Sequence, residues 1–466
     1  MSKPFESILV SEPPAERLEV CVTVPARDEE DLLPSALRAL AEQKTITGDP
    51  LDHERYEVIL LINNTRDRSR QVAEQFQRLY PTFRLHIVER NFNKSHSHNG
   101  YVRRLLMDEA CRRLEMRGGT CKAILTTDSD SQVAPNWISQ NQEELASGAE
   151  AVGGRIVILP CEEALLDPAT RAIQKYDHLY RRMIAWIEDR FDPQPHDPWP
   201  RHHQHFGASL ALTTRIYRSV GRLPPRRYFE DIAFYQAMIR HDVRLRHSSR
   251  VRVFTSARLT GRARFGLSSE LKDWQVCGRK GLRARVECRA FLEYLFATRS
   301  RFRSLWLDCH EKGEFSVHEV RELSRDTGIS FSDVATQLHR ARYFGLLLER
   351  TNFYAMCRKQ WPDRLRLAPL EYVANELRDA FNAQTRAAAR AHRVDRIQCE
   401  VVEVNAIRNG LERTHVRRHL EAGNSVLVQA NELVTNALGR QHGSLSARVG
   451  ARDLPARDSI RPLTKS

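Results

Sequence analysis

Hydrophobic and polar residues along the first two-thirds of the chain form short apolar runs separated by longer amphipathic stretches. Runs rich in Val, Ile and Leu predict strands, and apolar residues three and four positions apart predict helices. The expected strands are 18–24, 57–62, 84–88, 123–127, 151–159 and 243–254, and the expected helices are 29–43, 68–79, 101–115 and 137–146. This alternation predicts an α/β domain with a mostly parallel sheet flanked by helices.

The pattern changes beyond about Trp274, where the chain becomes helical throughout and rich in arginine. Helices are expected at 291–307, 317–326, 331–348 and 370–393. A stretch rich in Pro, His and Trp, 191–205, predicts a long loop. We therefore expect an N-terminal segment (1–17), an α/β domain (18–275), an all-helical C-terminal domain (276–441) and a disordered tail (442–466).

Two aspartates, Asp128 and Asp130, directly follow the apolar run 123–127. Carboxylates at the end of a buried strand are costly unless a cation neutralises them. Mg²⁺ and Mn²⁺ prefer such hard oxygen ligands and also bind diphosphates. Ligands of parallel α/β sheets bind at the carboxyl ends of the strands, where these aspartates fall. The pattern therefore favours a metal site, although Asp-x-Asp alone also fits a polar turn.

The composition narrows the class of protein. Hydrophobic residues make up 41% of the chain, mean hydropathy is −0.52, and no stretch approaches the about 20 apolar residues that span a bilayer. The first residues lack the apolar core of a signal peptide. Nine cysteines without a C-x-x-C pair argue against a zinc ribbon or a disulfide framework. We expect a cytoplasmic protein.

The net charge of +14 comes mostly from arginine and predicts attraction to anionic partners. Nucleotides, nucleic acids and an anionic membrane surface all fit, and the charge alone does not choose among them.

Four segments in order along the chain resemble a family 2 glycosyltransferase of the GT-A fold, over about residues 18–270. Residues 20–30 are similar to the family's opening strand and its P-x-x-N-E turn, and residues 57–69 to its second strand and D-x-S-x-D turn. Asp128 and Asp130 match the metal-binding aspartates. Residues 206–221 look like the acceptor-side segment that precedes the family's Glu-Asp pair, here Glu230-Asp231.

The resemblance implies a nucleoside diphosphate sugar as donor, an Mn²⁺ or Mg²⁺ ion held by Asp130 and Asp128, and an unknown hydroxyl as acceptor. The expected nucleotide-binding residues are Pro25, Arg27, Asp28, Glu29, Asn63, Asn64 and Asp128. Asp28 stands where the family usually has asparagine. Asn63 and Asn64 replace an acidic residue that often contacts the base or the ribose, which puts that contact in doubt.

The resemblance also implies transfer with inversion, which requires a base to take the proton of the acceptor hydroxyl. Asp231 is the expected base, and Glu230 is expected to orient or bind the acceptor. Acidic residues also favour the first turn of a helix, so the pair alternatively caps the helix that follows.

Weaker candidates surround these residues. Arg258, Arg262 and Arg264 are expected to contact a diphosphate, although a solvated basic loop fits equally well. Trp199 is expected either to stack on a sugar or to pack the loop onto the core. His205 is expected either to contact the acceptor or to be exposed. Asn99 lies near the nucleotide or caps the helix that follows.

Two other functions remain open at this point. A helix-turn-helix pattern at 316–342, with a basic second helix, allows a degenerate transferase that binds nucleic acid. Helix pairs joined by a glycine turn are also common in bundles. A sugar-phosphate nucleotidyltransferase would show a Gly-rich loop after the first strand, where this chain has Pro25-Ala-Arg-Asp-Glu-Glu30.

Overall fold

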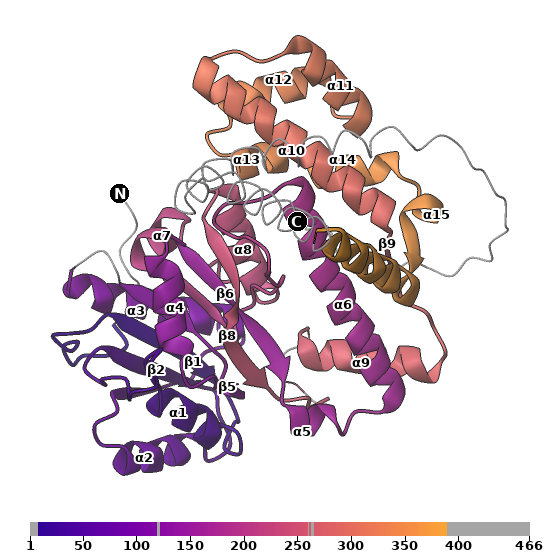
Figure 1. Cartoon of the computed structure of the whole chain (residues 1–466). Helices are drawn as coiled ribbons and strands as arrows, with labels where there is room; N and C mark the ends of the chain where they lie inside the picture. The colour runs from indigo at the N-terminus through magenta and orange to yellow at the C-terminus, as the bar shows by residue number, and fades with distance from the viewer. Residues whose placement is uncertain (1–7, 119–121, 260, 262–264, 389–466) are drawn as a thin grey trace, which may run out of the picture. The chain divides into compact units, whose positions relative to one another are not determined.

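The computed structural model describes residues 8–118, 122–259, 261 and 265–388. The described residues up to 374 form one compact unit, and residues 375–388 belong to a second. Figure 1 shows the strands and helices of the first unit. Its main sheet has the order β3-β2-β1-β4-β7-β6-β8-β5. The strands are β1 (Val20–Ala26), β2 (Tyr56–Asn63), β3 (Leu85–Arg90), β4 (Ala123–Thr126), β5 (Ser131–Val133), β6 (Ala151–Ile158), β7 (Leu210–Thr213) and β8 (Leu245–Thr255).

The sheet is parallel from β3 through β2 and β1 to β4, and β6 also runs parallel to β8. The strand β7 is antiparallel to both of its neighbours, and β5 is antiparallel to β8. The six expected strands are confirmed within two residues at each end. The two that the pattern missed, β5 and β7, have only three and four residues. The expected α/β architecture with a mostly parallel sheet is confirmed.

Helices cover both faces of this sheet. They are α1 (Leu33–Ala41), α2 (Ser69–Leu79), α3 (Asn99–Met116), α4 (Trp137–Ala146), α7 (Thr214–Ser219) and α8 (Glu230–Arg240). Two further helices, α5 (Pro160–Glu163) and α6 (Pro168–Phe191), follow β6, and α6 packs on the later helices of the chain. One hydrophobic core joins α1, α2 and α4 to residues such as Val22 and Leu60. A second core joins α3, α7 and α8 to Cys21 and Ile59, which point to the opposite face because side chains alternate along a strand.

The helix α1 begins four residues later than expected. The amide of Glu29 donates to Ser69 Oγ at 2.8 Å, and the amide of Glu30 donates to Asp67 Oδ2 at 2.9 Å. Residues 28–30 are therefore held as a turn by the loop that follows β2, and the helical conformation starts only at Leu33.

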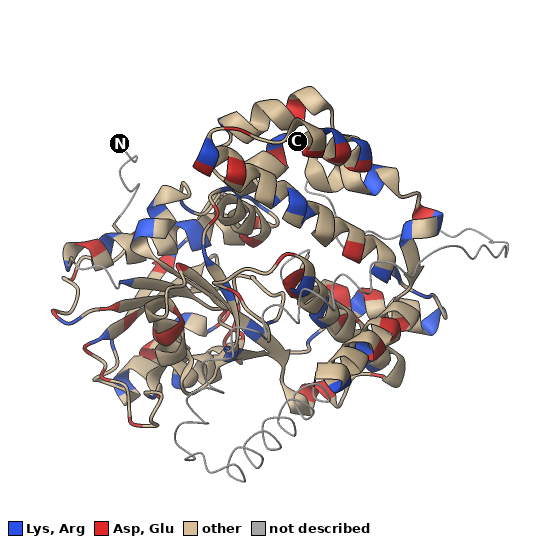
Figure 2. Ribbon diagram, turned by 45° about the horizontal axis from the view of Figure 1, so that its top comes forward, with Lys and Arg blue, Asp and Glu red and all other residues tan. Residues whose placement is uncertain are grey.

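The rest of the described chain is mainly helical, as expected. It comprises α9 (Leu267–Arg279), β9 (Arg285–Glu287), α10 (Arg289–Lys312), α11 (Val317–Thr327), α12 (Phe331–Arg340), α13 (Phe344–Arg350), α14 (Phe353–Gln360), α15 (Asp363–Arg366), β10 (Leu367–Pro369) and a helix at 370–388. Lys and Arg alternate with Asp and Glu along these helices (Figure 2). None of the helices in the described part of the chain combines the length and apolar character that a membrane crossing requires.

The expected helix 331–348 is two helices, α12 and α13, separated by residues 341–343. Asp242 explains the break, because its carboxylate accepts the amides of Phe344 at 2.6 Å and Gly345 at 2.7 Å. A carboxylate at a helix start satisfies amides that have no partner within the helix. The expected tail 442–466 and the end of the C-terminal domain lie outside the described residues, and the domain boundary at 275 stays a prediction.

Candidate active site

The loops after β1 and β2 are bonded together at the carboxyl edge of the sheet. The Asp28 amide donates to Thr65 Oγ1 at 3.1 Å, and the Asp28 carboxylate accepts the amide of Arg66 at 2.6 Å. Asp28 has a φ of +52°, a left-handed conformation that asparagine and aspartate tolerate better than most residues. Pro25 lies in β1, and Arg27 lies beside Asp28, with its Nε 3.8 Å from Asp28 Oδ2. Pro25, Arg27 and Asp28, which the sequence resemblance predicts to bind the nucleotide, therefore lie together at the end of β1 and in the turn that follows it.

Asn63 and Asn64 connect the loop after β2 to the segment after β3. Asn63 Nδ2 donates to the carbonyl of Ser97 at 3.4 Å. Asn64 donates to the carbonyl of Phe92 at 2.8 Å and accepts the amide of Phe92 at 3.2 Å. An aspartate has no N–H to donate, so these contacts give a structural reason for amides at two positions where the resembled family is often acidic.

Asp130 lies in a cluster of charged side chains with Glu29 and Arg258. Arg258 Nη2 donates to Asp130 Oδ2 at 2.6 Å and to Glu29 Oε1 at 2.8 Å, and its Nη1 donates to Glu29 Oε2 at 3.0 Å. Burial raises the pKa of Asp130 to about 6, with Asp128 and Glu29 adding to the rise and Arg258 opposing it. Arg258 thus joins the turn after β1 to the segment after β4.

Asp128 is held by Arg103, a residue of α3 that sequence analysis did not select. Arg103 Nη2 donates to Asp128 Oδ1 at 2.6 Å. The same guanidinium donates to Thr126 Oγ1 and, at 2.8 Å, to the carbonyl of Gly207. Arg103 is buried one turn before Met107, within the apolar stripe of α3. A charged residue on such a stripe is the signal that would have identified it.

Glu230 and Asp231 begin α8, and Glu230 turns toward α3. Asn99 Nδ2 donates to Glu230 Oε1 at 2.7 Å. Asn99 is therefore not the cap of α3; His98 is, because its side chain accepts the amide of Tyr101. Burial raises the pKa of Glu230, with Asp231 adding to the rise and Arg103 opposing it.

Asp231 has two contacts of unequal length. Its Oδ1 accepts the amide of Ile232 at 2.8 Å, as an acidic residue in the first turn of a helix does. Its Oδ2 lies 3.5 Å from the amide nitrogen of Gly207, a long contact that leaves acceptor capacity for a substrate hydroxyl. The geometry accommodates both a capping role and a role as base.

The charge balance of this region favours a cation. Asp128 and Glu230 pair with Arg103, and Glu29 and Asp130 pair with Arg258, so the carboxylates of this region, Asp231 included, outnumber these two guanidinium groups. Within the described residues, no three His, Cys, Asp or Glu side chains form a complete metal site. Mg²⁺ commonly uses only one or two protein carboxylates and completes its shell with water and phosphate. The residues therefore fit a divalent ion that binds together with a diphosphate.

Trp199 and His205, two other weak candidates, have partners of their own. The Trp199 amide donates to Asp189 Oδ1 at 3.0 Å, and its ring lies 5.8 Å from the guanidinium carbon of Arg182, so Trp199 packs on α6. The His205 ring stacks on Tyr235 of α8, with 3.5 Å between ring centroids. Arg262 and Arg264 lie outside the described residues.

His202, in the same loop, makes the fold sensitive to acid. It is buried, its Nδ1 accepts the amide of Gln204 at 2.9 Å, and its Nε2 lies 3.1 Å from the carbonyl of Ser248. These partners fix the neutral ring, and burial, with a contribution from His247, lowers the pKa of His202 to about 3.

Between about pH 6.5 and pH 3 the unfolded chain binds a proton at His202 that the folded chain does not. Stability is therefore full above about pH 6.5 and falls as the pH drops, by about 2 kcal/mol at pH 5. We expect urea unfolding to show this loss, and we expect His202→Asn, less stable at neutral pH, to show a shallower pH dependence. An unchanged pH dependence in that variant would assign the acid sensitivity to other groups.

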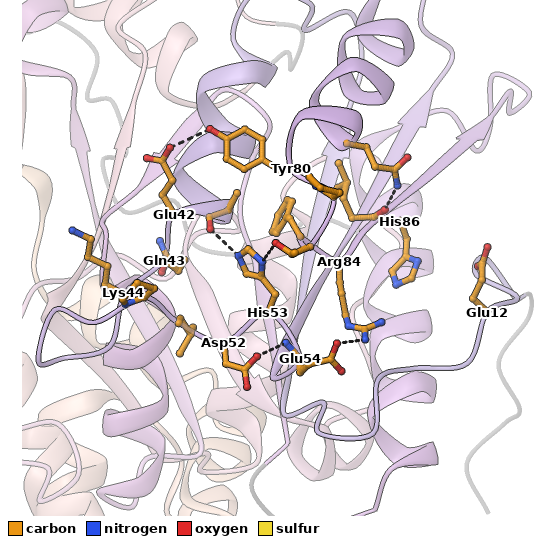
Figure 3. A pocket seen from close by; sticks show the side chains of 18 residues that line it. Glu12, Glu42, Gln43, Lys44, Asp52, His53, Glu54, Tyr80, Arg84 and His86 are labelled. Carbon is orange, nitrogen blue, oxygen red and sulfur yellow. Dashed lines mark hydrogen bonds and ion pairs between the residues drawn. The ribbon is translucent and has the colours of Figure 1, made fainter.

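A cavity of about 1210 Å³ lies away from the acidic cluster (Figure 3). Its lining residues precede β2 and β3, so it opens at the amino ends of these strands. Several of its polar groups have partners in the protein: His53, for example, bonds Thr82 Oγ1 at 3.1 Å and the carbonyl of Ala41 at 3.0 Å. The parallel sheet places the expected ligand site at the opposite edge.

Comparisons with solved structures give distant similarities. A mannosyltransferase from Pyrobaculum calidifontis, in complex with GDP-Man and Mn²⁺, is 14% identical over 77% of this chain and 79% of its own, with a TM-score of 0.36. TarS residues 1–349 from S. aureus, in complex with UDP, is 12% identical over 74% and 92%, with a TM-score of 0.37. Glucosyl-3-phosphoglycerate synthase from Mycobacterium tuberculosis, with Mn²⁺, UDP-Glc and phosphoglyceric acid, is 14% identical over 58% and 82%, with a TM-score of 0.30. No curated protein matches the chain.

A family model supplies the assignment. Residues 21–212, which run from β1 through β7, match the model of glycosyl transferase family 2. The matched range includes the turn after β1, Asn63 and Asn64 at the end of β2 and both aspartates after β4, and it ends before Glu230 and Asp231. Residues 21–212 of the chain are therefore identified as a glycosyl transferase family 2 domain.

Proposed function

We propose that this protein is a metal-dependent, inverting transferase that moves a sugar from a nucleoside diphosphate sugar to a hydroxyl acceptor. The observation that carries the proposal is the acidic cluster at the carboxyl edge of the sheet, with Asp130 and Asp128 on one side and Glu230 and Asp231 on the other. Arg103 contacts both sides through Asp128 and Glu230, so they belong to one site.

The donor is proposed to lie over the turns after β1 and β2, against Pro25, Arg27, Asp28, Glu29, Asn63 and Asn64. Asp130 is the main proposed metal ligand and Asp128 the second, and a bound Mn²⁺ or Mg²⁺ would neutralise the charge of the leaving diphosphate. Arg258 lies on Asp130 and Glu29, where its guanidinium is within one side-chain movement of a diphosphate bound beside Asp130.

The acceptor hydroxyl is proposed to approach Asp231, which takes its proton. The long contact of Asp231 Oδ2 leaves this oxygen able to accept a hydrogen bond, while the Ile232 amide holds the other oxygen. Glu230, fixed by Asn99, is proposed to orient the acceptor. Protons move efficiently only between groups within hydrogen-bond reach, so the acceptor oxygen is proposed to bind beside Asp231.

We further propose that residues 276–441 form a helical domain that packs on the α/β domain or docks a partner. The proposal includes a cytoplasmic location with peripheral contact of the basic chain to anionic lipid. Nucleic-acid binding is disfavoured because α11 carries Glu319, Glu322 and Asp326 beside its arginines and α12 has an acidic residue, Asp333, in its first turn.

The experiment that tests the transferase proposal is a thermal-shift screen with UDP, GDP, CDP and dTDP, each with and without Mn²⁺ or Mg²⁺. A ligand that binds only the folded state raises the melting temperature by mass action, so no acceptor is needed. We expect one diphosphate to give a shift that requires the metal. No shift with any of the four would contradict the proposal.

The Asp130→Ala variant is expected to lose the metal-dependent shift. Removing a carboxylate that binds the metal weakens the nucleotide–metal complex by about 100-fold, or roughly 2.7 kcal/mol. Isothermal titration with the diphosphate found in the screen measures the loss. The Asp308→Ala variant removes an exposed carboxylate of α10 and is expected to bind as the wild type does. Unchanged affinity in Asp130→Ala would remove Asp130 from the metal site.

A further inference from the structure

The geometry assigns to Arg103 the role of a positioning residue that fixes the donor-side Asp128 and the acceptor-side Glu230 relative to each other. This inference rests on the proposed function and adds a residue of α3 to the site. Arg103 touches neither donor nor acceptor in this scheme; it acts through the two carboxylates.

Three features show that Arg103 is built into the site. Its side chain is only 3% exposed, although arginine is rarely buried without partners. Its Nη2 bonds Asp128, and its Nη1 bonds the carbonyl of Gly207 and Thr126 Oγ1. These partners lie in β4, in the segment after β4 and in the segment before β7, so the guanidinium fork bonds all three.

The conformation of Arg103 depends on a glycine. A Cβ at Gly207 would lie 2.7 Å from the Arg103 Cζ, closer than any side chain tolerates. The Gly207 peptide also links the two sides of the site. Its carbonyl accepts from Arg103 at 2.8 Å, and its amide lies 3.5 Å from Asp231 Oδ2. A shift of Arg103 therefore moves the peptide that faces the proposed base.

One donor of Arg103 has no partner yet. Its Nε is buried and has no hydrogen-bond partner among the described residues, and it lies 3.8 Å from Glu230 Oε1. Asn99 holds the same oxygen at 2.7 Å. Catalytic hydrogen bonds are often long in the free enzyme and shorten in the substrate complex. We infer that the contact between Arg103 Nε and Glu230 shortens when donor and acceptor are bound.

The test compares Arg103→Lys and Gly207→Ala with the wild type. Lysine keeps the charge but lacks the planar fork, and alanine displaces the guanidinium without removing any charged group. Kinetics are measured as hydrolysis of the nucleotide sugar whose diphosphate gives the metal-dependent thermal shift. We expect kcat to fall by about 100-fold in each variant, as for a misplacement of about 1 Å, with KM changed by less than about 3-fold.

A matched control lies on the same helix. Arg113 is also fully buried and paired with a carboxylate, Glu57, but away from the site. Arg113→Lys is expected to lower the melting temperature and to leave kcat unchanged. The double variant Arg103→Lys/Gly207→Ala is expected to be no slower than the slower single variant, because both changes break the same contact.

The outcomes separate this inference from the proposed function. A metal-dependent shift in the wild type together with wild-type kcat in Arg103→Lys overturns the positioning role and leaves the transferase proposal standing. A fall in kcat equal to that of Arg113→Lys also overturns it, because the loss is then one of folding. If no diphosphate raises the melting temperature of the wild type, both the transferase proposal and the positioning role fail, because Arg103 then has no nucleotide site to align. Arg103→Lys alone decides the matter if Gly207→Ala does not fold.

Discussion

Replacing Asp231 with asparagine is expected to lower the turnover number by about 10³-fold while nucleotide binding stays intact, because general-base catalysis contributes 10²–10⁴-fold. Asparagine has nearly the same shape as aspartate and still accepts the amide of Ile232, but it cannot take a proton. Turnover is measured as release of the nucleoside diphosphate, and binding as the metal-dependent thermal shift.

The control for Asp231 must address its alternative role as a helix cap. Asp333 lies in the first turn of α12, far along the chain from the site, and Asp333→Asn tests an acidic residue at a helix start. We expect this change to lower the melting temperature slightly without affecting turnover. If Asp231→Asn behaves like Asp333→Asn, the base lies elsewhere.

The second large effect is expected at the buried ion pair between Arg113 of α3 and Glu57 of β2. Both side chains are 0% exposed, and Arg113 donates to both oxygens of Glu57, at 2.6 and 2.7 Å. Burial alone would raise the pKa of Glu57, but hydrogen bonds from Arg113 and His86 outweigh it and lower the pKa to about 2. Arg113→Met leaves Glu57 buried without its main partner and is expected to cost about 3–5 kcal/mol of unfolding free energy, measured in urea.

A double variant separates the loss of the pair from loss of packing. Arg113→Met with Glu57→Met removes both charges and is expected to recover much of the stability, since an apolar pair of similar volume is often as stable as a buried ion pair. If the double variant is less stable than Arg113→Met alone, packing rather than the unpaired charge explains the loss. A cost below about 1 kcal/mol for the single variant would contradict the prediction.

Local patterns in the sequence predicted most of the sheet and one half of the site. The apolar runs that form β1, β2 and β4 are fully buried, and such runs are the clearest strand signals. Because parallel strands present their carboxyl ends at one edge, Asp128 and Asp130 were expected at the ligand-binding edge of the sheet. Arg258, 128 residues further along than Asp130, bonds Asp130 and Glu29.

What local patterns cannot predict is the choice of partners for buried polar groups. Asn99 was open as a cap or as a nucleotide contact; it instead bonds Glu230, 131 residues away. The break between α12 and α13 depends on Asp242, 102 residues earlier in the chain. Each of these contacts depends on how helices and strands pack in three dimensions. The spacing of apolar residues within one helix or strand therefore does not predict it.

The helix that begins with Glu230 and Asp231 is also supported at its other end. A Cβ at Gly345 of α13 would lie 1.9 Å from the carbonyl oxygen of Ile239, so the two helices are in backbone contact at this glycine. Arg240 also pairs with Glu349. The region after the sheet is therefore not an exchangeable module. A recombined protein that joined this transferase domain to a different helical region would keep Glu230 and Asp231 at the start of α8. The last turn of α8, however, would no longer pack against α13.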